Sequence, residues 1–509
     1  MTNYTYKALG ATQALPLDDG YVAVRFKEPA KMSVRKEAAL FAGIEAFADR
    51  IEVPNEKITV VPVAKGGIAL AERSLRTMAA LDAHPQVARS APVFKLGEKR
   101  VVATDRALFG FKQAGSDNRA LLEQLGGTVT REDGAEYVVQ LPEGADPFDY
   151  CNRVAAAKPD LSYAEPDFAV IGRHLTRVLP PPGMAAQASD PLLASQYAPR
   201  ITNAVDAWTI QSGIPSVQIA ILDEGVDTGH PDLKGAIVAT FDAIDRDSFQ
   251  DPNSWDGHGT ACAGLAAAIP DNNAGIRGIG GGCSLMAARI AYSNAPHGPW
   301  VFNDLNASDA IDWAWQNGAS VLSNSWGGGP VSGRLAAAFE RARTQGRGGR
   351  GCVIVFAAGN KPGPVMFPAT LPNVLAVSAT NEYDEFKTPS SRDGEHWWGS
   401  SFGPEIAVAA PGVHNMTTDI SGTAGYDRSD YYAVFNGTSS ATPIVAGAAG
   451  LLLSANPSLT EAQVRDIIKQ TADKIGPLPY TGGRNDQFGH GRLNVLNAVL
   501  AARNGAANP

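Results

Sequence analysis

Residues 217–227 read Val-Gln-Ile-Ala-Ile-Leu-Asp-Glu-Gly-Val-Asp, an apolar run that ends directly in acidic and small residues. Similar apolar runs follow at 320–323, 352–356 and 374–377. Strands with continuous apolar sequence are buried on both faces, as in a parallel sheet covered by helices. We therefore predict an α/β domain with a mostly parallel sheet over about 190–504. In such sheets chemistry gathers beyond the carboxyl ends of the strands.

The sequence has 509 residues, enough for two or three domains. Its hydrophobic content of 44% and charged content of 19% are those of an ordinary globular protein. The net charge of −9 argues against nucleic acid and anionic membranes as partners. We also find no apolar run of the roughly 18 residues that a transmembrane helix needs. We therefore expect neither a nucleic-acid nor a membrane partner.

Four cysteines, at positions 151, 262, 283 and 352, are widely spaced and form no metal-ligand pairs. We expect them to be small buried side chains in a reducing compartment. The N-terminal sequence also lacks a basic segment followed by an apolar stretch, as a secretory signal would have. The expected location is therefore the cytoplasm.

A proline-rich stretch at 180–186 predicts a linker, assigned to 173–189, in front of the α/β domain. A weak internal repeat before this linker predicts two small modules, at 20–97 and 98–172, behind a tail at 1–19. Both modules fit the order strand, helix, strand, strand, helix, strand, which is the split βαβ pattern. We therefore predict two ferredoxin-like α+β modules ahead of the α/β domain.

Three polar segments lie where the α/β architecture would place a site. Asp223 ends the first strand, His258 lies in Asp-Gly-His-Gly-Thr-Ala at 256–261, and Ser439 lies in Asn-Gly-Thr-Ser-Ser-Ala at 436–441. A serine hydroxyl is a poor nucleophile until a base takes its proton, and a carboxylate must hold that base in the correct tautomer. The three segments supply these roles in the order Asp, His, Ser.

These segments resemble the Asp-Thr/Ser-Gly, His-Gly-Thr and Gly-Thr-Ser-x-Ala-x-Pro signatures of the subtilisin family. The resemblance covers about 190–504 and implies a serine endopeptidase that works through an acyl-enzyme, with Asp223, His258 and Ser439 as its triad. Ala-Ala-Gly-Asn at 357–360 resembles the oxyanion-hole segment of the family, so Asn360 would donate its side-chain amide. The second front module resembles the family's propeptides, which implies a zymogen with an inhibitory prosegment.

The same resemblance predicts where a substrate binds. Ser325, Trp326 and Gly327 resemble the edge to which a substrate peptide adds as an extra strand. Met366 would line an apolar S1 pocket. Protein or peptide substrates and the chain's own prosegment are therefore the expected partners.

Two acidic residues flank the triad: Glu224 follows Asp223, where bacterial subtilisins usually carry Ser or Thr, and Asp256 lies two residues before His258. We hypothesise that these two carboxylates favour Lys or Arg at the P2 position of the substrate by charge pairing. The alternative is that both are solvated or paired with structural arginines.

Asp190 and Asp232 match positions that carry calcium ligands in several relatives, and Asn272 lies in a matching loop; their hard oxygen atoms suit that ion. A turn rich in Asp and Asn is the alternative for these residues. The chemistry itself needs no cofactor, and no cluster of His and Cys indicates zinc.

Two further hypotheses stay open beside the endopeptidase. One is a catalytically silent binding or regulatory protein on the same scaffold, although such a protein is free to lose any of its triad residues. The other keeps the enzyme and makes residues 20–172 a docking platform for a protein partner. A serine-carboxyl peptidase of the sedolisin type would also contain Gly-Thr-Ser, but it would lack His258 and Asn360.

Overall fold

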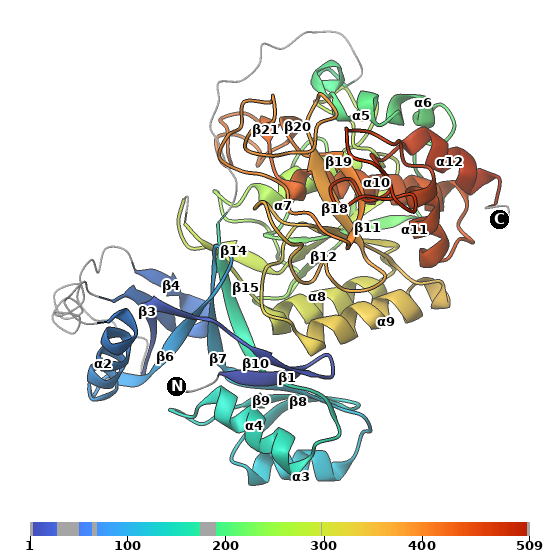
Figure 1. Ribbon diagram of the computed structural model, residues 1–509. Helices are drawn as coiled ribbons and strands as arrows, with labels where there is room; N and C mark the ends of the chain where they lie inside the picture. Colours follow the sequence, from blue (N-terminus) through green and yellow to red (C-terminus); the bar gives the residue numbers. More distant parts are fainter. Residues whose placement is uncertain (1–3, 28–49, 64–68, 174–189, 297, 506–509) are drawn as a thin grey trace. The chain divides into compact units, whose positions relative to one another are not determined.

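The structure, a computed structural model, describes residues 4–27, 50–63, 69–173, 190–296 and 298–505 (Figure 1). Apart from Arg173, the predicted linker lies outside the described residues. Backbone contacts group the chain into two compact units, which we call the front unit and the rear unit. The front unit consists of Met1–Arg173, Gly298–Leu305 and Gly329–Ala336, and the rear unit of His174–His297, Asn306–Gly328 and Ala337–Pro509. Two short segments of the predicted α/β domain therefore belong to the front unit.

The rear unit is built on a seven-stranded parallel sheet, in the order β12-β13-β11-β16-β17-β18-β19. Four of its strands begin one residue after the start of a predicted apolar run, and nearly all their side chains are buried. The predicted fold class is therefore confirmed. The strands are β11 (Gln218–Asp223), β12 (Ile237–Asp242), β13 (Ser284–Arg289), β16 (Val321–Asn324), β17 (Val353–Ala357), β18 (Leu375–Thr380) and β19 (Ile406–Pro411).

Two buried helices of the rear unit, α7 (His258–Ala267) and α10 (Thr438–Ala455), begin at or beside predicted catalytic residues. Helix α10 is long and apolar enough to cross a membrane, but 94% of it lies buried in the protein, as in a core helix. The other rear elements are η3 (Leu193–Ser195), α5 (Ala198–Ile201), α6 (Ala204–Trp208), β14 (Ala291–Ser293), β20 (Asn415–Thr418), β21 (Tyr431–Phe435), α11 (Glu461–Gln470) and α12 (Val495–Arg503). Helices α8 (Asp304–Gln316) and α9 (Gly333–Gly349) start in segments of the front unit.

The second predicted module shows the full split βαβ order. Its elements are β7 (Lys99–Phe111), α3 (Ser116–Gln124), β8 (Thr128–Asp133), β9 (Glu136–Gln140), α4 (Pro147–Ala157) and β10 (Leu161–Gly172). In the first module, the stretch between β3 and β4 that would hold the first helix lies mostly outside the described residues. The described elements there are β3 (Leu17–Phe26), β4 (Ile51–Val53), η2 (Pro54–Glu56), β5 (Ile58–Pro62), α2 (Leu70–Asp82) and β6 (Val87–Leu96).

Both modules share one antiparallel sheet, in which β15 (Trp300–Asn303), β10, β7, β6, β3, β5 and β4 are successive neighbours. Residues 5–14, which we predicted as part of a tail, form the hairpin β1 (Thr5–Ala8) and β2 (Ala11–Ala14) instead. Strand β1 also pairs with β10. The reason is packing, because the ring of Tyr6 is buried against Phe168 at 5.3 Å between centroids.

Candidate active site

The predicted catalytic carboxylate and base meet at the carboxyl end of β11. Asp223 is the last residue of β11, and His258 is the first residue of α7. Nδ1 of His258 lies 2.8 Å from Oδ1 of Asp223, and each residue is 5% exposed. Glycine must follow the histidine, because a Cβ at Gly259 would lie 2.1 Å from the carbonyl oxygen of Gly225. The small residue thus allows the helix start to approach the strand end.

Ser439 lies in the first turn of α10, after Gly437, whose φ of +115° favours glycine. The Ser439 hydroxyl donates to the carbonyl oxygen of Ser325 at 3.1 Å, and the Ser325 hydroxyl donates back to the carbonyl oxygen of Ser439 at 2.9 Å. The thiol of Cys262 lies between serine and histidine, 3.6 Å from the Ser439 carbonyl oxygen and 3.9 Å from Nδ1 of His258. The structure therefore brings the three predicted triad residues into one buried cluster.

The charges of this cluster increase the basicity of the imidazole. Burial lowers the pKa of His258, but the Asp223 carboxylate outweighs burial and holds that pKa well above its usual range. Burial raises the pKa of Cys262, so its thiol keeps its proton at neutral pH. Within the described ranges, Asp223, His258 and Cys262 are the one group of three or more His, Cys, Asp or Glu side chains whose ligand atoms could share a metal ion. From the sequence, Cys262 was expected only to be a small buried side chain.

Asn360 follows β17 and faces the start of α10. Its Oδ1 accepts hydrogen bonds from the backbone amide of Thr438 at 2.7 Å and from the Thr438 hydroxyl at 2.8 Å. This fixes the orientation of the carboxamide, so its NH2 group is directed away from Thr438. The arrangement suits an oxyanion donor that acts together with the backbone N–H of Ser439.

Replacing Asn360 by leucine is expected to lower kcat by about 10²–10³-fold, the usual cost of removing one oxyanion donor. KM should change little, because the donor acts on charge that develops only in the transition state. Steady-state kinetics on a chromogenic peptide would measure both constants. Thr438→Val is the matched control: it removes a hydrogen bond to Asn360 but keeps the donor. An equal loss in both variants would mean that Asn360 only supports the loop.

In the predicted substrate-binding edge, some residues can meet a peptide through their backbone and others through their side chains. Trp326 is 6% exposed and packs edge-to-face on Phe356 at 5.2 Å, so only its backbone is placed to meet a peptide. A Cβ at Gly327 would lie 3.1 Å from the carbonyl oxygen of Phe367. Glycine therefore suits this position, where the backbone of residue 327 lies close to Phe367. Met366 is partly exposed, and its methyl group lies against Gly359. This position agrees with an apolar wall beside the oxyanion segment.

Glu224 and Asp256 do not present charge to a substrate. Each is 1% exposed, and both approach Ser293: the Ser293 amide donates to Asp256 at 3.0 Å, and the Ser293 hydroxyl lies 3.5 Å from Glu224. Burial raises the pKa of Glu224 to about 8, so this carboxyl is mostly neutral at pH 7. The geometry therefore argues against the predicted pairing with a basic P2 residue, because the two carboxyls are covered.

Replacing Glu224 by glutamine is expected to stabilise the protein at alkaline pH. Burial raises the pKa of Glu224 from 4.5 to about 8, so the folded state holds a proton that the unfolded state has released between these values. This carboxyl's contribution to stability is present below pH 4.5 and is lost as pH rises towards 8, at about 1.4 kcal/mol per pKa unit. The gain in unfolding free energy on substitution should therefore grow by a few kcal/mol between pH 5 and pH 8.

Denaturant unfolding at both pH values, in a Ser439→Ala background that prevents self-digestion, would measure this gain. Glu405→Gln, at an exposed carboxyl, is the control and should show no such growth. A gain for Glu224→Gln that is the same at pH 5 and pH 8 would contradict the prediction.

The predicted calcium residues also lie together. Oδ1 of Asp232 accepts the Asn272 side-chain amide at 2.8 Å, and Oδ2 accepts the backbone amide of Ile276 at 2.9 Å. Asp190 is 1% exposed, and its carboxylate oxygens have no hydrogen bond of normal geometry within the described residues. Burial raises the pKa of Asp190, although the backbone amides of Asp271 and Asn272 oppose this. A cation that prefers oxygen ligands would fit a buried carboxylate whose oxygens lack such hydrogen bonds.

A second polar cluster lies inside the front unit. Glu165 on β10 is fully buried and accepts hydrogen bonds from the start of α9: from the Ser332 hydroxyl at 2.7 Å and from the amides of residues 333 and 334 at 2.8 and 3.1 Å. Asp167 on the same strand accepts the backbone amide of Leu305, near the start of α8, at 3.3 Å. Carboxylates at these places satisfy backbone amides that helices leave unpaired. The last strand of the predicted prosegment therefore caps two helices of the predicted α/β domain.

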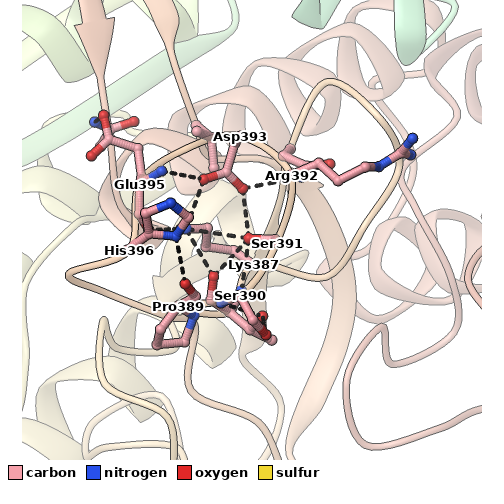
Figure 2. Close-up of polar contacts among 12 residues, drawn as sticks. Lys387, Pro389, Ser390, Ser391, Arg392, Asp393, Glu395 and His396 are labelled. Atoms are coloured by element: carbon pink, nitrogen blue, oxygen red, sulfur yellow. Dashed lines mark hydrogen bonds and ion pairs between the residues drawn. The ribbon is translucent and has the colours of Figure 1, made fainter.

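Residues 381–405, between β18 and β19, were given no role from the sequence. They contain a buried polar network around Lys387, which Figure 2 shows. A connection longer than about 15 residues is uncommon in a compact domain and is often functional. That length, with the adjacent Trp397 and Trp398, was the signal available in the sequence.

Comparisons with known proteins agree with this geometry. Thermitase of Thermoactinomyces vulgaris is 36% identical over 313 residues, which cover 61% of this chain and 98% of thermitase. A calcium-dependent protease of a Nostoc species is 36% identical over 334 residues, and this chain spans about half of its length, 48%. The fold of fervidolysin, a keratinolytic enzyme from Fervidobacterium pennivorans related to subtilisin, matches with a TM-score of 0.61 at 24% identity, covering 78% of this chain and 61% of fervidolysin.

The sequence model of the subtilase family matches residues 215–491, more than half of the chain. This range includes Asp223, His258, Asn360 and Ser439. The chain belongs to the subtilase family.

Proposed function

We propose that the protein is a serine endopeptidase that hydrolyses peptide bonds in proteins, with Asp223, His258 and Ser439 as its triad. The buried 2.8 Å contact between Asp223 and His258, beside the helix start that bears Ser439, carries this proposal. A catalytically silent binding protein would have no need to keep these groups and Asn360 in this arrangement.

In the proposed reaction, the Ser439 hydroxyl turns from Ser325 towards His258, and Nε2 takes its proton as Oγ bonds to the substrate carbonyl carbon. The carbonyl electron pair moves onto oxygen, where Asn360 and the Ser439 amide stabilise the charge. His258 then gives the proton to the leaving amine as the C–N bond breaks, which leaves an acyl-enzyme. Water, deprotonated by His258, hydrolyses that ester. Asp223 holds the Nδ1–H tautomer and stabilises the imidazolium throughout.

Labelling with a fluorophosphonate, which forms a covalent adduct with an activated serine, would test the proposed activity. We expect one adduct per chain in the wild type and none in Ser439→Ala. A wild type that stays unlabelled, even after limited proteolysis around 174–189, would favour the silent binding protein.

We further propose that residues 20–172 act as an inhibitory prosegment of a zymogen. The capping contacts of Glu165 and Asp167 support this, because they tie the last prosegment strand to helix starts within the subtilase match. Glu165→Ala should therefore shorten the delay before the purified full chain becomes active. Glu143→Gln, at an exposed carboxyl of the same module, should leave the delay unchanged. Equal delays in all three proteins would contradict an inhibitory contact at Glu165.

Structural calcium is a third part of the proposal. Asp190, Asp232 and Asn272 would hold the ion through oxygen atoms, and it would stabilise the fold rather than take part in the chemistry. Calcium in excess over EDTA should raise the unfolding temperature of the Ser439→Ala chain, because a ligand that binds only the folded state stabilises it. Asp232→Asn should reduce that increase. An unfolding temperature that calcium leaves unchanged would count against the site.

The docking platform on residues 20–172 and the cytoplasmic location remain proposals as well. All four cysteines are unpaired and buried, which supports a reducing compartment. Cell fractionation with an antibody to the chain would test the location. Co-purification of a stoichiometric partner that is lost on deletion of 20–97 would support docking.

A further inference from the structure

The connection between β18 and β19 is held by a buried lysine. Figure 2 shows Lys387, Ser391 and Asp393 directed towards one another. The Lys387 ammonium is fully buried and donates to Asp393 at 2.8 Å and to the carbonyl oxygens of Thr388 at 2.9 Å and Glu395 at 2.5 Å. Burial raises the pKa of Asp393, but hydrogen bonds from Lys387 and neighbouring groups outweigh it, so this pKa lies below its usual range. A buried, fully bonded ion pair of this kind fixes the conformation of the segment.

This segment is attached to the loop that precedes the nucleophile. Glu395 is fully buried, and its Oε1 accepts hydrogen bonds from the Asn436 side-chain amide at 3.4 Å and from the His414 ring at 3.1 Å. Oδ1 of Asn436 in turn accepts the backbone amide of His414 at 2.8 Å. Asn436 stands three residues before Ser439, so Glu395 connects the segment to the catalytic loop.

The other end of the segment is attached to the oxyanion loop. The Ser401 amide donates to the carbonyl oxygen of Gly359 at 2.8 Å, and the Ser401 hydroxyl donates to that of Lys361 at 2.8 Å. These two carbonyls flank Asn360 in the sequence. A Cβ at Gly399 would lie 2.8 Å from Pro362, so the segment lies directly against this loop. Residues 395–401 therefore bridge the two loops that supply the nucleophile and the oxyanion donor.

Trp397 lies between these two attachments and is 47% exposed, unlike its neighbour Trp398, which is 2% exposed. The indole N–H of Trp397 donates to Glu395. The polar edge of the ring is thus occupied, and what the side chain offers to solvent is apolar aromatic surface. A large aromatic side chain fixed by a hydrogen bond beside a catalytic centre is suited to binding.

We propose that Trp397 is a specificity-determining residue that binds a large apolar side chain on the leaving-group side of the substrate. This inference rests on the proposed endopeptidase function. Ser325 to Gly327 form the edge for the acyl part, whereas the leaving amine takes its proton from His258. Phe435 packs edge-to-face on the His258 ring at 5.4 Å and precedes Asn436, so the attachment of Trp397 adjoins the residues around the histidine.

The same chain of contacts indicates which substrate position is involved. The P1′ nitrogen must lie at His258, and an extended peptide advances about 3.3–3.6 Å per residue. In the described contacts, Asn436 and Glu395 stand between Phe435 and Trp397. We therefore assign the indole to P2′ or P3′ rather than to P1′. Glu395, which holds the indole, pairs with His414, and charged groups linked to it are engaged in Glu382–His414 and Lys387–Asp393 pairs, which favours an apolar over a charged side chain at this position.

Transfer of the acyl group to an added peptide amide measures binding on the leaving-group side alone, because the acceptor amide occupies that side when it attacks the acyl-enzyme. The full chain would be given a peptide ester without primed residues, together with Gly-Phe-NH2 or Gly-Gly-NH2 as the acceptor, and active enzyme would be counted by fluorophosphonate titration. In the wild type we expect Gly-Phe-NH2 to capture more acyl-enzyme than Gly-Gly-NH2. Trp397→Ala should reduce that preference by about three- to tenfold, the value of one aromatic contact. Capture is expressed relative to ester hydrolysis without acceptor, because the ester has no primed residues.

Two controls separate binding from folding. Trp397→Phe should keep most of the preference, and Tyr383→Ala, which removes an exposed aromatic ring from the same connection, should leave it intact. A preference unchanged in Trp397→Ala, or a stronger capture of Gly-Arg-NH2 than of Gly-Phe-NH2, would overturn the inference. A wild type that does not hydrolyse the ester would instead refute the proposed endopeptidase function.

Discussion

Replacing Ser439 by alanine is expected to lower kcat by about 10⁶-fold, a magnitude known from subtilisin. The variant lacks the nucleophile, so only transition-state binding and a general water reaction remain. The fold should survive, because the lost hydroxyl makes one hydrogen bond, to the Ser325 carbonyl, which is worth about 1 kcal/mol. Hydrolysis of a chromogenic peptide at high enzyme concentration, with thermal unfolding of the same samples, would measure both effects.

The neighbouring serine supplies the control for this substitution. Ser440 is fully buried, and its hydroxyl accepts a hydrogen bond from Asn415 at 2.7 Å, so it is held away from the reaction. Ser440→Ala should therefore keep kcat within about tenfold of the wild type while losing some stability, about 1–3 kcal/mol for the buried donor left unpaired. Activity that survives in Ser439→Ala but disappears in Ser440→Ala would reverse the assignment of the nucleophile.

Replacing Asp223 by asparagine is expected to lower kcat by about 10⁴-fold with little change in structure. In the wild type, Oδ1 accepts the Nδ1–H of His258 at 2.8 Å, which leaves Nε2 without a proton and able to act as a base. An asparagine can present its NH2 group to Nδ1, which favours the wrong tautomer, and it removes the charge that stabilises the imidazolium. Turnover at pH 8, corrected for active enzyme, would measure the loss.

A buried aspartate two strands away in the same sheet provides the comparison. Asp242 ends β12, is fully buried and pairs with Arg289 at 3.0 Å, but it does not contact the imidazole. Asp242→Asn should lower stability and leave kcat per active enzyme nearly unchanged. Similar losses of kcat in both variants would mean that Asp223 matters for packing rather than for the tautomer of His258.

The rear unit could be predicted closely because its signals are local. A continuous apolar run predicts a central strand that is buried on both faces of the sheet. Strands such as β11 and β17 were therefore located to within one residue. The candidate triad followed from three short motifs and their order along the chain. The structure adds why Gly259 and Gly437 stand in two of them: a close approach at Gly259 and a positive φ at Gly437 favour a residue without a Cβ.

The burial of side chains and the pairing of residues far apart in the chain could not be predicted in this way. The sequence presents Glu224 and Asp256 as two charges near the triad, yet both are covered and converge on Ser293. Whether a carboxyl carries charge depends on how much water reaches it, and that is set by residues distant in the chain. Burial likewise places Tyr6 and β1 in a sheet where a tail was predicted.

By itself, the sequence determined the parallel α/β fold, the split βαβ order of the second module, and the identity of the candidate triad and Asn360. Only the tertiary structure decided that segments 298–305 and 329–336 belong with the front unit, that Glu165 and Asp167 cap helix starts, and that a buried Lys387 holds Trp397 beside the catalytic loops. The physical reason is the distance along the chain between the residues that interact. Strand runs, helix starts and glycine turns are encoded by neighbouring residues, whereas ion pairs, capping and solvent exposure depend on residues that the fold brings together from far along the chain.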